Sequence, residues 1–173
     1  MPVVINGVTL RNATCNGEKV KKIVYNGAVV YSAEVEVFPN GSNWEPIHVD
    51  SHWYITSSTP TNITIKSEWW NNNTYANVVT SSAIDLTDYN TLSATFTITG
   101  MGSGNNPYND WYAGINSSKS GSPSQKASKR VTTNGTYTVT FDVSGLNGNH
   151  YVYFGGKNNY SNATCTVQSI MLT

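Results

Sequence analysis

Aromatic side chains beside asparagine-rich segments are the residues of this sequence best suited to do chemistry, and that chemistry would be the recognition of sugars. Aromatic rings stack on the C–H faces of sugars, while amide and hydroxyl groups satisfy the sugar hydroxyls. The sequence has five Trp and eleven Tyr. The candidate ligand-binding residues are those that stand in or beside polar, Asn-rich sequence, namely Trp69, Trp70, Asn72, Tyr108, Trp111, Tyr112 and Tyr160.

Two interpretations of these rings stay open. Neighbouring residues of a strand point to opposite faces, so at least one of Trp69 and Trp70 should face solvent, where it could contact a ligand. The alternative is that the rings fill a core, because the cores of β-sandwiches also use Trp and Tyr. The position of the rings next to polar loops favours exposure and ligand contact.

Catalytic chemistry has no comparable support. The sequence contains no G-x-S-x-G, H-E-x-x-H or G-x-x-x-x-G-K-[ST] segment. If residues 47–55 form one strand, His48, Asp50 and His52 share a face, but the two histidines are then ~13 Å apart and one metal could take only two of the three. We interpret this segment as the polar face of a strand, and we expect no catalytic residue, no metal site, no cofactor and no enzymatic activity.

The elements that position these residues are β-strands. Only 12% of the residues are charged, with 10 Lys and Arg against 10 Asp and Glu, whereas Asn, Ser and Thr number 22, 19 and 21. Asn, Ser and Thr compete with the helical backbone for hydrogen bonds, so the composition favours a nearly all-β chain. A neutral chain also argues against nucleic acid as a partner. No apolar run approaches the ~20 residues of a membrane span and the start lacks a signal-peptide pattern, so we expect neither membrane insertion nor a secretion signal. The two cysteines, Cys15 and Cys165, are expected to be buried, reduced thiols.

Asn-Gly pairs organise the first 32 residues. They occur at 6–7, 16–17 and 26–27, a ten-residue period, and Asn-Gly between apolar runs is a strong signal for a two-residue hairpin. We predict a small β-hairpin meander over residues 1–32, too small to be stable without the main domain or a partner. Four basic residues against one acid give this unit a charge of +3.

Longer strands follow, and the pattern over residues 34–173 predicts an antiparallel two-sheet sandwich. Apolar residues alternate with Ser and Thr over 92–99 and with Thr and Asp over 136–143. In the last strand the alternation shifts by one residue, which a β-bulge near Gln168 and Ser169 would reconcile. Two polar loops, 102–109 and 117–129, are expected at one end of the sandwich. The other expected strands are 35–38, 47–55, 63–66, 75–79, 111–115, 151–154 and 164–172.

A family resemblance rests on four segments, which are IDLTDYNTL (84–92), YTVTFDVSGL (137–146), YVYFG (151–155) and VQSIML (167–172). They resemble the galactose-binding-like jelly roll of carbohydrate-binding modules, over about residues 35–173. The resemblance implies a jelly-roll fold and sugar binding for those members that have a sugar site. Members often hold a structural calcium between a carboxylate on the first strand and one on the last. Glu34 and Glu36 match the first, but residues 167–170 include no acid, so no calcium is expected.

A second resemblance rests on residues 17–32, above all on VKKIVYNGAVVY (20–31). This run is similar to the short hairpin segments that open structural proteins of tailed bacteriophages and prophages, in tails, baseplates and capsid appendages. It implies a virion protein that is assembled in the bacterial cytoplasm and needs no secretion signal.

Together these patterns give a leading hypothesis and two alternatives. In the first, a phage or prophage virion protein docks to other virion subunits through residues 1–32 and displays its sandwich outward to bind host or environmental glycans. Weak sugar sites gain from avidity, so a trimer or many copies on one particle is expected. The alternatives are a purely structural component, such as a capsid decoration or tail protein, and a free bacterial lectin-like module.

Overall fold

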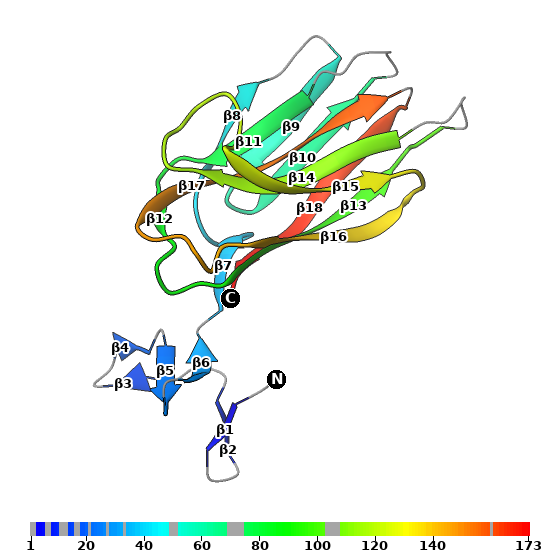
Figure 1. Ribbon diagram of the computed structural model, residues 1–173. Helices are drawn as coiled ribbons and strands as arrows, with labels where there is room; N and C mark the ends of the chain where they lie inside the picture. The colour runs from blue at the N-terminus through cyan, green and yellow to red at the C-terminus, as the bar shows by residue number, and fades with distance from the viewer. Residues whose placement is uncertain are drawn as a thin grey trace.

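The structure is a computed structural model, and it describes residues 3–5, 8–10, 14–15, 18–20, 22–26, 28–32, 34–48, 52–68, 75–102, 108–159 and 161–173. Every regular element within these ranges is a β-strand, and all pairings are antiparallel (Figure 1). The described part of the chain holds no helical segment with the length and hydrophobicity that a membrane span needs.

In the described residues the N-terminal strands form three two-stranded hairpins, and one Asn-Gly pair stands in the sequence between the two strands of each. The paired strands are β1 (Val3–Ile5) with β2 (Val8–Leu10), β3 (Thr14–Cys15) with β4 (Glu18–Lys19), and β5 (Lys22–Tyr25) with β6 (Ala28–Ser32). Asn26 has a φ of 49°, the left-handed conformation that a type I′ turn requires. The predicted N-terminal β-hairpin unit is therefore confirmed in the residues that the structure describes.

Two six-stranded sheets follow, and we name each after its central strand (Figure 1). The β18 sheet has the order β16-β13-β18-β10-β9. β7 pairs with the C-terminal part of β18, on the same side as β10, which pairs with its N-terminal part. Its strands are β7 (Val35–Phe38), β9 (Trp53–Thr59), β10 (Asn62–Ser67), β13 (Thr91–Thr99), β16 (Gly135–Asp142) and β18 (Ala163–Leu172). The β17 sheet has the order β15-β14-β17-β11-β8. β12 pairs with the N-terminal end of β17, and β11 pairs with the residues that follow. Its strands are β8 (Trp44–His48), β11 (Tyr75–Thr80), β12 (Ile84–Asp85), β14 (Tyr108–Asn116), β15 (Gln125–Val131) and β17 (Asn149–Asn159).

The core lies between the two sheets and confirms the predicted sandwich. On β13, Leu92, Ala94, Phe96 and Ile98 are completely buried, as their alternation predicts. Four large rings meet at the centre: Trp53 and Phe96 come from the β18 sheet, and Trp111 and Phe154 come from the β17 sheet. Cys165 is also buried and reduced, and burial raises the pKa of its thiol. For Cys15, whose side chain is not described, the expectation stays a prediction.

The predicted bulge in the last strand is confirmed by the strand register. Thr95 of β13 faces Ser169, but the next residue, Phe96, faces Val167, so Gln168 is the extra residue. Gln168 is exposed, while Val167 and Ile170 on either side of the bulge are both buried. One inserted residue thus lets both apolar sets of β18 face the core.

Three sequence-based predictions about loops and strands are wrong. Residues 47–55 are not one strand, because β8 ends at His48 in the β17 sheet and β9 begins at Trp53 in the β18 sheet. His48 and His52 therefore do not lie on a single strand, and Asp50 lies outside the described residues. Residues 125–131, expected in a loop up to Lys129, form the edge strand β15. The two polar loops leave opposite ends of β14, since this nine-residue strand joins them.

Candidate ligand-binding face

The outward side of the β17 sheet, which we call the outer face, gathers polar and aromatic side chains from four strands. Residues that face one another across an antiparallel pair lie on the same side of the sheet. One row therefore runs through Ser128, Tyr112, Gly155 and Asn77. A second row contains Arg130, Asp110 and Lys157. A third contains Lys126, Gly114, Tyr153, Val79 and Glu45.

The seven predicted ligand-binding residues fall into three groups. Tyr108 and Tyr112 belong to the outer face, Tyr108 half-buried and Tyr112 only 4% exposed. Trp111 points the opposite way, into the core, and is 0% exposed. Its ring is therefore not available to a ligand, and we remove it from the candidate site. Four of the seven, namely Trp69, Trp70, Asn72 and Tyr160, lie outside the described residues.

Residues 117–124, which join β14 to β15 and which we call the strap, cover one end of the outer face. The Ser120 N–H donates to the Tyr153 hydroxyl at 2.9 Å, and this hydroxyl lies 3.2 Å from the Ser118 carbonyl and 3.1 Å from the Ser120 carbonyl. The Asn77 side chain donates from Nδ2 to the Gly121 carbonyl at 2.9 Å. Asn77 and Tyr153 are both 0% exposed although they point away from the core. The strap thus gives the outer face a buried, hydrogen-bonded half.

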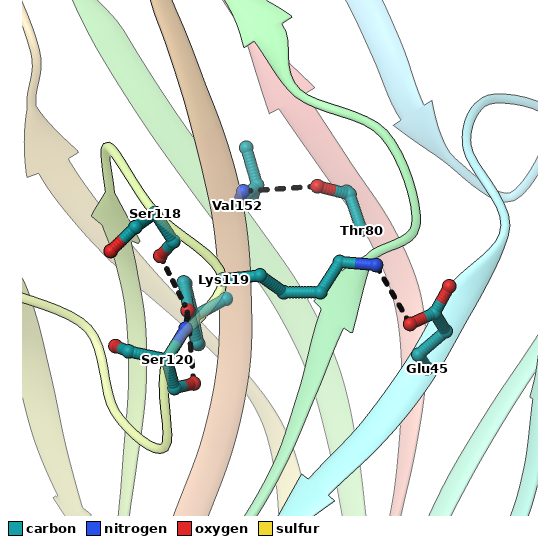
Figure 2. A network of polar contacts seen from close by, with 7 residues as sticks. Glu45, Thr80, Ser118, Lys119, Ser120 and Val152 are labelled. Atoms are coloured by element: carbon teal, nitrogen blue, oxygen red, sulfur yellow. Dashed lines mark hydrogen bonds and ion pairs between the residues drawn. The ribbon is translucent and has the colours of Figure 1, made fainter.

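Figure 2 shows how the strap is fixed across the sheet. Lys119 extends from the strap to β8, where its Nζ lies 2.8 Å from Oε2 of Glu45. Close to it in Figure 2, the Val152 N–H donates to the Thr80 hydroxyl at 3.1 Å and so continues the pairing of β17 where β11 ends. Because the side chains of Lys119 and Glu45 are 31% and 49% exposed, this ion pair contributes little to stability. The buried hydrogen bonds of Tyr153 and Asn77 contribute more to holding the strap in place.

Glycine makes the close approach of the strap and of the neighbouring rings possible. A Cβ on Gly114 would lie 2.8 Å from Cβ of Pro123 in the strap. A Cβ on Gly155 would lie 2.5 Å from Oδ1 of Asn77 and 3.0 Å from the Tyr112 hydroxyl. Both contacts are shorter than, or at the limit of, what real side chains tolerate, so no larger residue fits either position without a shift of its neighbours.

The other half of the outer face carries tyrosine rings that lie under cations. The guanidinium carbon of Arg130 is 3.7 Å from the centroid of the Tyr108 ring, and Nζ of Lys126 is 4.6 Å from that of Tyr112. At the strap, Nζ of Lys119 is 5.6 Å from the centroid of Tyr151. Each distance is within the ~6 Å over which a cation is attracted to a ring. In this open half, Ser128 and Arg130 are exposed, and Asp110, Lys157 and Asn159 are half-buried.

Other parts of the described chain are weaker candidates for a site. Within the described residues, no three His, Cys, Asp or Glu side chains are grouped so as to hold a metal ion. A polar hollow of about 520 Å³ lies at the ends of β10 and β18, but its lining has no aromatic ring. The lining residues are Lys66, Ser67, Glu68, Gly100, Asn162, Ala163 and Thr164.

Comparison with known proteins gives structural neighbours only. No family model matches the sequence, and no curated protein matches it. Among solved structures, the chain is similar to a family 11 carbohydrate-binding module from Clostridium thermocellum in complex with a β-1,3-1,4-mixed-linked tetrasaccharide. The identity is 16% and the TM-score 0.46, over 80% of this chain and 93% of that one. It is also similar to the enzymatically active domain of tailspike protein 4 of bacteriophage CBA120, at 12% identity and a TM-score of 0.43, over 79% of this chain and 20% of that one. A CBM4 structure is similar at 11% identity and a TM-score of 0.41, over 78% of this chain and 98% of that one.

The sequence did not reveal which cations lie over Tyr108 and Tyr112. Arg130 and Lys126 reach the outer face because β15 is a strand, and every second residue of an edge strand points outward. The available signal was the two-residue spacing of Lys126, Ser128 and Arg130, which share one side, against the buried Val131 on the other. Asp110 and Asn77 could be placed only by the pairing of strands distant in sequence.

Proposed function

We propose that the sandwich binds glycans through the open half of the outer face. The observation that carries this proposal is the grouping of a half-buried ring, Tyr108, with the carboxylate of Asp110, the hydroxyl of Ser128 and the amide of Asn159 on one side of one sheet. The polar groups supply donors and acceptors for the hydroxyls of a sugar, and the ring supplies apolar surface beside them. Because these groups lie on strands, their spacing is fixed before the ligand arrives, which lowers the entropic cost of binding.

A glycan array probed with the full-length protein, presented multivalently, tests this proposal. We expect saturable binding to a defined glycan, and we expect Tyr108→Ala and Asp110→Asn to weaken it without changing the melting temperature by more than a few degrees. Tyr54→Ala is the matched control, because Tyr54 is an exposed tyrosine, 42% exposed, on β9 of the other sheet. Equal loss with Tyr54→Ala, or no binding to any glycan, would refute the assignment of the site.

The setting we propose is a phage or prophage particle, on which residues 1–32 dock to other virion subunits and many copies are displayed. Each described N-terminal strand pairs with one neighbour only. The free backbone edges of such two-stranded hairpins suit strand addition from a neighbouring subunit. A protein without residues 1–32 should keep its sandwich folded but fail to enter particles. Normal incorporation of the truncated protein would remove the docking role.

The second candidate is a purely structural virion component that binds no sugar. The burial of Trp111 in the core favours it, as do the cations that lie over Tyr108 and Tyr112, because both observations give the rings a role in stability. The glycan array distinguishes the two candidates, because the structural component would bind intact particles but no glycan on the array.

A further inference from the structure

We propose that the glycan bound by the outer face is acidic, and that Lys126 and Arg130 of β15 bind its carboxylate groups. This inference rests on the proposed glycan-binding function and names the class of ligand. Four observations carry it. They are the placement of the cations, the distribution of charge over the sandwich, the cations that lie over the rings of Tyr108 and Tyr112, and the position of Asp110 beside the cations.

The cations stand in a fixed line along the edge of the face. Lys126, Ser128 and Arg130 all point to the outer side of β15 and all are exposed. Residues two apart on a strand are ~7 Å apart, so the two cations are separated by ~13 Å with a hydroxyl between them. Lys157 lies two strands further in, across from Asp110. An extended chain with a carboxylate on some of its sugars, laid along β15, would meet a cation, a hydroxyl and a second cation in turn.

Positive charge is concentrated on this side of a sandwich that is negative overall. Residues 33–173 contain six Lys and Arg against nine Asp and Glu, a net charge of −3. Five of those six cations lie on β15, on β17 or in the strap, namely Lys119, Lys126, Lys129, Arg130 and Lys157. Lys119 is paired with Glu45, and Lys129 lies over Tyr137 of the other sheet. The outer face thus has Lys126 and Arg130 exposed beside the half-buried Asp110, a local excess of positive charge that attracts anions.

The covered rings disfavour a neutral ligand. To stack on the side of Tyr108 that Arg130 covers, a neutral sugar would have to displace the guanidinium and lose a cation–ring attraction of about 0.5–1 kcal/mol. A carboxylate gains instead from the cation where it already lies, because Arg presents a planar fork of N–H donors that matches a carboxylate. Tyr108 then positions the guanidinium and contributes to binding through it.

A sugar acid fits this face better than a nucleic acid does. Single-stranded nucleic acids need open rings on which bases stack, and the Tyr108 and Tyr112 rings carry cations. Asp110 lies between Arg130 and Lys157 in the register and would repel a closely spaced row of phosphates. An acidic glycan has fewer charges along its length, and its hydroxyls give Asp110 and Ser128 hydrogen-bond partners.

The test uses polysaccharides that differ in charge alone. Polygalacturonate, alginate and hyaluronan, each beside its carboxyl-reduced neutral form, are presented to the full-length protein at 50 and 300 mM NaCl, with single-stranded DNA as a further probe. We expect at least one acidic polymer to bind tenfold or more tightly than its reduced form, and this binding to weaken as salt rises. Arg130→Gln and Lys126→Gln should each lower the affinity about two- to five-fold, the range of an exposed ion pair. Lys66→Gln, at an exposed lysine on the outward side of the other sheet, should not change it.

The outcomes separate this inference from the proposed function. Equal or tighter binding of the reduced forms overturns the acidic class while glycan binding stands, and Arg130→Gln should then strengthen binding by opening the Tyr108 ring. Tighter binding of single-stranded DNA, or an equal loss with Lys66→Gln, also overturns it. Silence toward every polymer refutes the proposed function itself.

Discussion

The ring of Trp111 lies nearly parallel to that of Phe154, with centroids 5.8 Å apart and an interplanar angle of 13°. Both rings come from the β17 sheet, and both also contact Phe96 of the opposite sheet. A Cβ on Gly156, the residue across from Trp111, would lie 2.6 Å from Cε3 of the indole. The small residue on one strand and the large ring on the next form one packing unit.

Trp111→Ala should therefore act on stability. Truncation of a fully buried tryptophan leaves a cavity and costs about 3–5 kcal/mol, a large part of the stability of a domain of this size. Tyr108→Ala, three residues earlier and half-buried, should cost less than half of that. Urea unfolding followed by circular dichroism measures both. Equal losses in the free energy of unfolding for the two variants would contradict the central role of Trp111 in the packing of the core.

Tyr153→Phe tests what holds the strap. The change removes one oxygen that accepts from the Ser120 N–H and contacts two strap carbonyls, and it should cost about 1–3 kcal/mol. Amide hydrogen exchange over residues 117–124 should become faster while that of β17 stays slow. Tyr137→Phe is the control, since the Tyr137 hydroxyl bonds with Thr133, an exposed residue. If the Tyr153 variant leaves exchange in 117–124 unchanged, the strap is held by other contacts.

Deletion of Gln168 should be tolerated far better than deletion of Thr166. Without Gln168, Val167 still faces Phe96 and Ser169 still faces Thr95, so every apolar residue of β18 keeps its side. Without Thr166, one part of the strand must turn its apolar residues outward. Thermal unfolding should show a folded protein for the first deletion and loss of the cooperative transition for the second. A folded Thr166 deletion would show that the register of β18 is not fixed by burial.

Cys165 should make stability fall with rising pH. Burial raises the pKa of its thiol in the folded protein, whereas the unfolded thiol ionises near pH 8.5. Below that pH both states hold the proton and stability is unaffected. Above it only the unfolded state releases the proton, so the free energy of unfolding should fall by up to about 1.4 kcal/mol per pH unit.

Denaturant unfolding of Cys15→Ser between pH 8 and 9.5 measures this slope, and the double variant with Cys165→Ala should lose it. A thiol reagent should modify Cys165 only as fast as the protein opens. Rapid modification at neutral pH would contradict its burial.

The sequence specified the fold well wherever one face of a strand is apolar. β13 and β16 were predictable because every second residue is apolar or aromatic and the remainder are Ser, Thr or Asp. β15 was missed because, as an edge strand, it buries only Val131. Its existence depends on pairing with β14, which no local pattern records.

The candidate site was only partly predictable for a related reason. Tyr108 and Trp111 have similar sequence surroundings, and the direction in which each points depends on where β14 begins. The cations that lie over Tyr108 and Tyr112 come from β15, 22 residues after Tyr108 in the case of Arg130 and 14 residues after Tyr112 in the case of Lys126. For Trp69, Trp70, Asn72 and Tyr160 the exposure inferred from the sequence stays a prediction.

The place of β18 in its sheet bears on how the protein is made. This strand, the last of the sandwich to leave the ribosome, lies in the middle of its sheet, with β13 on one side and β10 and β7 on the other. Until residues 163–172 are synthesised, β13 and β10 have no partner between them, and half of the core stays open. The β18 sheet can therefore be completed only after this segment is translated. During translation, the exposed edges of β13 and β10 are where nascent chains on neighbouring ribosomes could pair wrongly.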